Sequence, residues 1–274
     1  MLTADKKGFK FQVSGFRFQV PSSKLKTSRI KLKNFSYFMS NPYFSFKQFT
    51  VYHDRCAMKV GADGVTLGAW ADVAEAKHIL DVGCGSGLIT LMLAQRIDTE
   101  ITAIDIDYQS VIQAKENIKR SPWKNRISVY HASFQDFSNK KEEKFDLIVC
   151  NPPFFVHSMK SASAARTTAR HTDTLSHLEL ITNSQKCLSV QGKLCVILPV
   201  PEGNEFVLSA EKEGLSCIKK VSVFPNFEKS AKRLLLEFQK EKTRREETNL
   251  VIEKERNVYT PQYAELVKGF YLKL

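Results

Sequence analysis

The chain has 274 residues, of which 43% are hydrophobic, and this is enough to form one large domain with a buried core. The composition excludes a chain that is disordered throughout, and no apolar run approaches the ~20 residues that a membrane-spanning helix needs. The formal net charge of +12 favours a polyanionic partner.

The six cysteines are scattered along the chain and form no Cys-x-x-Cys pair. This spacing excludes a zinc ribbon and a disulfide framework, and we expect no metal site. Most of the cysteines sit in apolar surroundings, which predicts buried thiols in a reducing compartment and a cytoplasmic protein.

The basic charge is concentrated at the start of the chain. Residues 1–38 contain nine Lys and Arg and one acidic residue, so they carry eight of the +12 charges. They also contain a near repeat, Gly8–Val13 and then Gly15–Val20, and no apolar core of a secretion signal. We interpret this segment as an extension that is disordered, or translated from an upstream repeat with the true start at Met39. A basic arm along a nucleic-acid backbone is the alternative. Residues 39–274 are then expected to form a single domain.

From His78 onward, short apolar runs alternate with helical patterns, which predicts parallel strands joined by crossover helices. The expected strands cover residues 78–82, 101–106, 127–131, 145–150 and 193–198, and then 215–224 and 233–239. The last two have only a short polar connection between them, so one of them must be antiparallel. The sequence therefore predicts an α/β fold with a seven-stranded, mostly parallel sheet, an antiparallel terminal hairpin and helices on both faces.

The first expected strand runs into a glycine-rich turn, Asp81-Val-Gly83-Cys84-Gly85-Ser86-Gly87, before a helix. Glycines permit a tight turn and let a ligand approach the backbone. The dinucleotide fingerprint G-x-G-x-x-G fails because Leu88 occupies its last position. The turn indicates a ligand site, and a plain strand-to-helix turn is the alternative.

An acidic residue, Asp105, ends the next expected strand. A carboxylate at this place accepts hydrogen bonds from both hydroxyl groups of a bound ribose. Asp107, two residues later, is expected to cap the following helix instead.

Asn151-Pro152-Pro153-Phe154 follows the fourth expected strand, at the sheet edge where open α/β folds bind ligands. Two prolines fix the backbone and remove N–H donors, which leaves carbonyl oxygens free to accept. The Asn151 side-chain oxygen and the Pro152 carbonyl could hold the two hydrogens of an exocyclic amine while Phe154 stacks on the base. A tight turn beside a core aromatic residue is the alternative.

Together these motifs resemble the class I S-adenosylmethionine-dependent methyltransferases that modify planar nitrogens. Further stretches narrow the resemblance to the bacterial tRNA1(Val) (adenine(37)-N6)-methyltransferase family, over about residues 44–274. They are Phe46–Phe49, His53–Gly64, Leu67–Trp70, Tyr259–Pro261 and Phe270–Leu272.

The resemblance implies a Rossmann-like fold, S-adenosyl-L-methionine as the cofactor, tRNA as the partner and N6-methylation of an anticodon-loop adenosine. It implies a catalytic set of Asn151, Pro152, Pro153 and Phe154. It implies a cofactor-binding set of Asp81, Gly83, Cys84, Gly85, Gly87, Asp105, Ile106 and Ser133. Two positions depart from the family pattern. Ala62 replaces a common threonine, and Ser133 stands where an aspartate often receives the adenine amine, so Asp136 or backbone groups could take over that contact.

Two alternatives remain at this stage. N-P-P-[FY] also serves methylation of a release-factor glutamine amide and of guanine N2 in ribosomal RNA, although those relatives carry a larger amino-terminal domain. A catalytically silent RNA-binding module is the other alternative, and the intact glycine turn, Asp105 and Asn151 argue against it. The oligomeric state is left open.

Overall fold

The computed structural model describes residues 2–5, 8–13, 16–21, 41–140, 143–152 and 175–274. The chain divides into two compact units, Met1–Asn41 and Pro42–Leu274. In the first unit, β1 (Leu2–Asp5), β2 (Gly8–Val13) and β3 (Phe16–Pro21) form an antiparallel sheet in which the two repeats pair with each other. These strands lie where we expected disorder. The interpretation of residues 1–38 as an extension outside the main domain stays a prediction.

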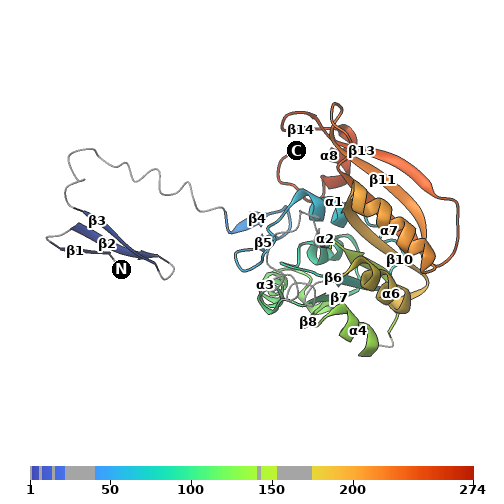
Figure 1. Cartoon of the computed structure of the whole chain (residues 1–274), viewed down its shortest axis with the longest axis horizontal. Helices are drawn as coiled ribbons and strands as arrows, with labels where there is room; N and C mark the ends of the chain where they lie inside the picture. Colours follow the sequence, from blue (N-terminus) through green and yellow to red (C-terminus); the bar gives the residue numbers. More distant parts are fainter. Residues whose placement is uncertain (1, 6–7, 14–15, 22–40, 141–142, 153–174) are drawn as a thin grey trace, which may run out of the picture. The chain divides into compact units, whose positions relative to one another are not determined.

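The second unit is built around a nine-stranded sheet with the order β14-β13-β11-β12-β10-β9-β6-β7-β8 (Figure 1). The strands that match the sequence prediction are β6 (His78–Val82), β7 (Glu100–Asp105), β8 (Ile127–His131), β9 (Phe145–Cys150), β10 (Leu188–Pro199), β11 (Ser216–Asn226) and β12 (Arg233–Gln239). Neighbours from β8 to β10 pair in parallel, whereas β12 is antiparallel to both β10 and β11. The predicted fold class and the antiparallel pairing of the hairpin β11–β12 are therefore confirmed, although this hairpin is not terminal in the sheet.

The sheet continues beyond the seven expected strands. β13 (Glu246–Glu255) pairs in parallel with β11, and β14 (Val258–Tyr259) pairs antiparallel to β13. Only Leu250 of β13 is buried. A strand whose side chains are charged or polar on most positions gives little periodic signal, so the sequence pattern missed it.

Helices cover both faces of the sheet. One face packs against α1 (Ala62–Trp70), α2 (Leu88–Arg96), α3 (Tyr108–Lys119) and α8 (Pro261–Val267). The other packs against α4 (Phe134–Lys140), α6 (His177–Cys187) and α7 (Val200–Lys212), and α6 and α7 lie side by side in Figure 1. Successive residues of β9 alternate between the two cores, with Leu147 and Val149 in one and Ile148 and Cys150 in the other.

Two short elements complete the second unit: the hairpin of β4 (Tyr43–Ser45) and β5 (Thr50–Tyr52), and the 3-10 turn Lys124–Arg126 before β8. The hairpin is attached to the C-terminal segment through stacked rings, because Phe46 lies 6.1 Å from Tyr271 between centroids. The N-terminal and C-terminal ends of this unit therefore stabilise one another.

All six cysteines are free thiols, and all except Cys56 are buried, as the sequence predicts. None of the helices in the described ranges is long and apolar enough to cross a membrane.

Candidate active site

A cavity of about 520 Å³ opens at the carboxyl ends of β6, β7 and β9. The sequence-predicted residues that line it are Gly83, Gly85, Asp105, Ile106, Ser133, Asn151 and Pro152. Residues from three separate motifs thus meet in one cavity, as expected for parallel strands whose carboxyl ends share an edge. Pro153 and Phe154 lie outside the described residues.

The glycine-rich turn leaves open space on its cavity side. Gly83 and Gly85 have positive φ angles of 72° and 55°, and a Cβ added at either would meet nothing within 4 Å. The turn is tied to β7, because the Gly83 and Cys84 amides donate to the Ile104 carbonyl at 2.9 and 3.0 Å. A side chain at either glycine would point into the cavity, so the bare backbone fits a ligand that lies directly against it.

Three residues of the predicted cofactor set lie behind the cavity wall. Gly87, with a φ of 80°, precedes α2 and packs against Ala114 of α3. The Cys84 thiol is buried, and burial raises its pKa well above the ordinary value, so it stays neutral. Asp81 is fully buried below the turn. These residues shape the turn rather than line the cavity.

Asp81 is held by α2. Thr90 Oγ1 donates to Asp81 Oδ2 at 2.5 Å, whereas Asp81 Oδ1 is buried without a hydrogen-bond partner among the residues that the structure describes. Burial raises the pKa of Asp81 to about 7, and the hydrogen bonds from Thr90 act in the opposite direction.

Asp105 connects the glycine turn to the start of α3. Its Oδ2 accepts from the Gly85 amide at 2.7 Å, and its Oδ1 accepts from the Asp107 amide at 2.8 Å. Burial raises the pKa of Asp105, with the two backbone hydrogen bonds acting against this. The carboxylate is therefore fixed in orientation beside the cavity, and its remaining lone pairs can accept from ligand hydroxyl groups.

Asp107 is the cap of α3, as the sequence predicts. Its carboxylate accepts from the Ser110 amide at 2.9 Å and from the Ser110 hydroxyl at 2.7 Å. Ile106, between the two aspartates, is 51% exposed and lines the cavity.

The segment after β8 brings Ser133 and Asp136 to the same cavity. The Ser133 hydroxyl donates to Asp136 Oδ2 at 2.9 Å and accepts from the Asp136 amide at 3.0 Å. The Ser133 hydroxyl thus makes both of these hydrogen bonds with Asp136, which also lines the cavity.

Asn151 follows directly after β9. Its Oδ1 is buried and accepts no hydrogen bond from any part of the chain that the structure describes. An unpaired buried acceptor costs about 1–3 kcal/mol, and such an atom is explained when a ligand supplies the missing donor. The predicted acceptor role of Asn151 therefore has a geometric basis, and the buried Pro152 beside it lines the same cavity.

Sequence reasoning missed part of the lining: Cys56, Ala57, Met58, Ser110, Gln135 and Leu175. The loop that carries the first three is attached to α3. Arg55 Nη1 contacts Glu116 Oε1 at 2.8 Å, and the Arg55 amide donates to Gln113 Oε1 at 3.3 Å. The only signal in the sequence was the resemblance of the stretch His53–Gly64 to a family block, which does not say what that loop contacts.

The comparisons with known proteins agree with this geometry. Residues 67–224 match the family model of the methyltransferase small domain. A tRNA1(Val) (adenine(37)-N6)-methyltransferase from Trichodesmium erythraeum is 48% identical, over 86% of this chain and 100% of the relative. One of the same name from Parabacteroides distasonis is 45% identical, again over 86% of this chain and all of the relative. This chain belongs to the tRNA1(Val) (adenine(37)-N6)-methyltransferase family.

Solved structures share the fold of this methyltransferase. A predicted O-methyltransferase from Agrobacterium tumefaciens superposes with a TM-score of 0.60 at 19% identity, covering 76% of this chain and 96% of that one. The NSun6 protein from Pyrococcus horikoshii gives a TM-score of 0.51 at 19% identity, covering 67% of this chain and 53% of that one.

Proposed function

We propose that this enzyme methylates N6 of adenosine 37 in tRNA1(Val), with S-adenosyl-L-methionine as the methyl donor. The relatives of that name, which align along their full length, support the substrate. The buried Asn151 oxygen, which accepts no hydrogen bond from the described residues, supports the chemistry. A tRNA substrate also implies that the enzyme works in the cytoplasm.

The cofactor half of the cavity is proposed to extend from the glycine turn to the segment after β8. The open space at Gly83 and Gly85 accommodates the part of the cofactor next to the turn. Asp105, held by two backbone amides, accepts from the ribose hydroxyl groups. Bound here, S-adenosylmethionine supplies an activated methyl group on a sulfonium sulfur.

Asn151 and Pro152 are proposed to hold the target amine. An aryl amine is a weak nucleophile, because its lone pair is delocalised into the ring. Acceptors at Asn151 Oδ1 and the Pro152 carbonyl would draw the N6 hydrogens out of the ring plane and stabilise the positive charge that develops on nitrogen. Phe154, in the predicted catalytic set, would stack on the target base.

The protein must also align the target amine with the methyl group and exclude water from the cavity. Holding the two reactants in this orientation can lower the barrier by ~7–11 kcal/mol. A strong general base is not needed, since a methylated aryl ammonium is acidic enough to lose its proton to water. Stacking on an aromatic ring is worth ~1–3 kcal/mol per base, and an unpaired loop nucleotide is easier to extrude than a paired one. Both points favour an anticodon-loop adenosine over a duplex.

The experiment uses purified protein, isotopically labelled S-adenosylmethionine and transcripts of tRNA1(Val), followed by nucleoside analysis. We expect N6-methyladenosine in the adenosine-37 transcript and no label in a matched transcript with guanosine at position 37. Label in release factor or in ribosomal RNA, with none in tRNA, would overturn the assignment.

A further inference from the structure

We propose that Asp136, and not Ser133, binds the exocyclic amine of the cofactor's adenine, and that Ser133 is a positioning residue for Asp136. This inference rests on the proposed use of S-adenosylmethionine. Asp136 would then make the cavity selective for adenine over a base that carries an oxygen in place of the exocyclic amine.

The hydrogen bonds of Ser133 make it a poor acceptor for the amine. A hydroxyl group has one proton and two lone pairs. The proton of Ser133 goes to Asp136 Oδ2 at 2.9 Å, and one lone pair receives the Asp136 amide at 3.0 Å. Only one neutral lone pair is left for a ligand.

Asp136 keeps more acceptor capacity and carries the charge. An ionised carboxylate offers about four lone-pair sites, and Ser133 occupies one of them. A hydrogen bond to an ionised acceptor is roughly twice as strong as one between neutral groups. Both residues line the cavity, and the Ser133 hydroxyl, which donates to the Asp136 carboxylate and accepts from the Asp136 amide, fixes the orientation of Asp136.

The place of Asp136 along the sheet edge fits the base of a nucleoside. β6, β7 and β8 are adjacent parallel strands, which lie ~4.8 Å apart. The glycine turn follows β6, Asp105 ends β7, and Asp136 follows β8. The Ala132 amide donates to the Asp105 carbonyl at 3.0 Å, so the last two strand ends are joined. A ribose on Asp105 therefore has its base one strand further along, at Asp136.

Two other lining residues are less suited to this contact. The side chain of Gln135 already hydrogen-bonds Glu179, at the start of α6. Ile106 has only an apolar side chain, half exposed in the cavity, which suits contact with the flat face of a base. Of the residues that line this end of the cavity, Asp136 is therefore the one whose charged acceptor remains available to the base.

The experiment measures binding rather than turnover. Titration calorimetry on the full chain compares S-adenosylhomocysteine with its inosine analogue, in which a carbonyl oxygen replaces the amine. We expect the wild type to prefer the adenosine compound about 10-fold or more, because an ionised carboxylate repels the carbonyl oxygen. In Asp136→Asn the preference should fall below about 3-fold, since the amide can donate to that oxygen.

Ser133 variants test the positioning role. Ser133→Ala should weaken binding of S-adenosylhomocysteine about 3-fold and keep part of the preference, and Ser133→Thr, which retains the hydroxyl, should restore the wild-type values. Asp98→Asn is the matched control, because this aspartate has a 98% exposed side chain and does not line the cavity. Thermal melting shows whether each variant is folded.

The outcomes separate this inference from the proposed function. If Asp136→Asn keeps the full preference for S-adenosylhomocysteine over the inosine analogue, the inference is wrong. It is also wrong if Ser133→Ala, in which Asp136 is intact, loses this preference completely. If the wild type binds S-adenosylhomocysteine with the expected preference but leaves tRNA unmodified, the inference stands and the proposed function fails. If the wild type does not bind S-adenosylhomocysteine at all, both fail.

Discussion

Asn151 has a buried side-chain oxygen that is not stabilised by a hydrogen bond from any residue that the structure describes. The buried Oδ1 atom has no hydrogen-bond donor within the described ranges, which costs folding free energy, whereas a bound amine would supply the missing donor. This is the pattern expected when a side chain serves the reaction at the expense of stability.

We therefore expect Asn151→Ala to separate activity from stability. The turnover rate on tRNA should fall by about 10²–10³, the effect of losing one acceptor or donor that stabilises developing charge. Binding of S-adenosylhomocysteine should stay within about 3-fold, and the melting temperature should be equal or higher. Steady-state kinetics, calorimetry and thermal melting check these three values. A variant that loses activity only because it melts below the assay temperature contradicts the assigned role.

Asp81 gives a stability prediction with a defined pH range. Burial raises its pKa from the ordinary 3.8 to about 7, so the folded protein binds this proton more tightly than the unfolded chain does. The contribution of Asp81 to stability is complete below pH ~4 and is lost as the pH rises to about 7. The loss is at most about 4 kcal/mol.

Asp81→Asn removes this titration while keeping an oxygen that can accept from Thr90. Relative to the wild type, the variant should therefore gain stability between pH 4.5 and pH 8. Urea unfolding of both proteins at these two pH values measures the difference, and all other titrating groups cancel in the comparison. A difference between the proteins that is the same at both pH values would show that Asp81 ionises normally.

At the level of elements, the sequence predicted the helices and strands that can be identified from their own residues, without contacts from elsewhere in the chain. The strands from β6 to β12 were predicted from short apolar runs, and the cap of α3 was predicted from Asp107. Both signals depend on only a few neighbouring residues. The sequence pattern did not predict α1, because this helix contains glycines, which have a poor helix propensity. A Cβ at Gly68 would lie 2.9 Å from Met92 Sδ, so that glycine permits close packing on α2 despite its poor helix propensity.

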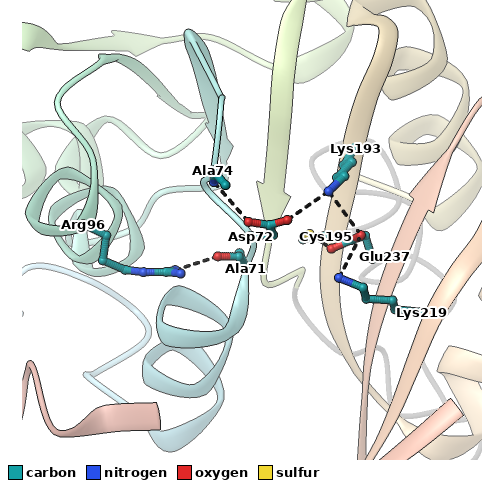
Figure 2. Close-up of polar contacts among 8 residues, drawn as sticks. All are labelled: Ala71, Asp72, Ala74, Arg96, Lys193, Cys195, Lys219 and Glu237. Atoms are coloured by element: carbon teal, nitrogen blue, oxygen red, sulfur yellow. Dashed lines mark hydrogen bonds and ion pairs between the residues drawn. The ribbon is translucent and has the colours of Figure 1, made fainter. Parts of the chain in front are cut away.

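Glu237 on β12 is a buried carboxylate of the sheet, 1% exposed. Figure 2 shows it beside two lysines from the neighbouring strands. Its Oε1 lies 3.7 Å from the amines of Lys193 on β10 and Lys219 on β11. Lys193 also contacts Asp72 Oδ2 at 3.0 Å and so joins the sheet to the segment after α1. A buried carboxylate of this kind is tolerated only while its cations are present.

Lys193→Ala should therefore destabilise the protein by about 1–3 kcal/mol, less than a fully buried pair because the lysine is about a quarter exposed. In the background of Glu237→Gln most of this cost should disappear, since no buried charge is left unpaired. Urea unfolding of the wild type, the two single variants and the double variant gives the coupling free energy. Equal costs of Lys193→Ala in both backgrounds would mean that the two side chains do not interact.

At the scale of the whole molecule, topology explains which parts of the site were predictable. Gly85, Asp105 and Asn151 end parallel strands or follow them, and all such ends meet at one edge of the sheet. Met58 and Leu175 reach the same cavity from loops, through contacts between residues far apart in the sequence. No local pattern encodes those contacts, so the sequence could not place these two residues.

The division of the chain into two units leads to a prediction for the 274-residue chain. The described residues of both hydrophobic cores and of the cavity lie within residues 42–274, whereas residues 1–38 carry most of the excess positive charge. We expect removal of residues 1–38 to leave the melting temperature and S-adenosylhomocysteine binding unchanged, and kcat/KM for tRNA within about twofold. The salt dependence of tRNA affinity decides between the two interpretations of the segment, because each lysine or arginine on a phosphate adds about 0.7–0.9 to the slope of log affinity against log salt. An unchanged slope agrees with an extension outside the functional domain, and a slope lower by several units would identify residues 1–38 as an RNA-binding arm.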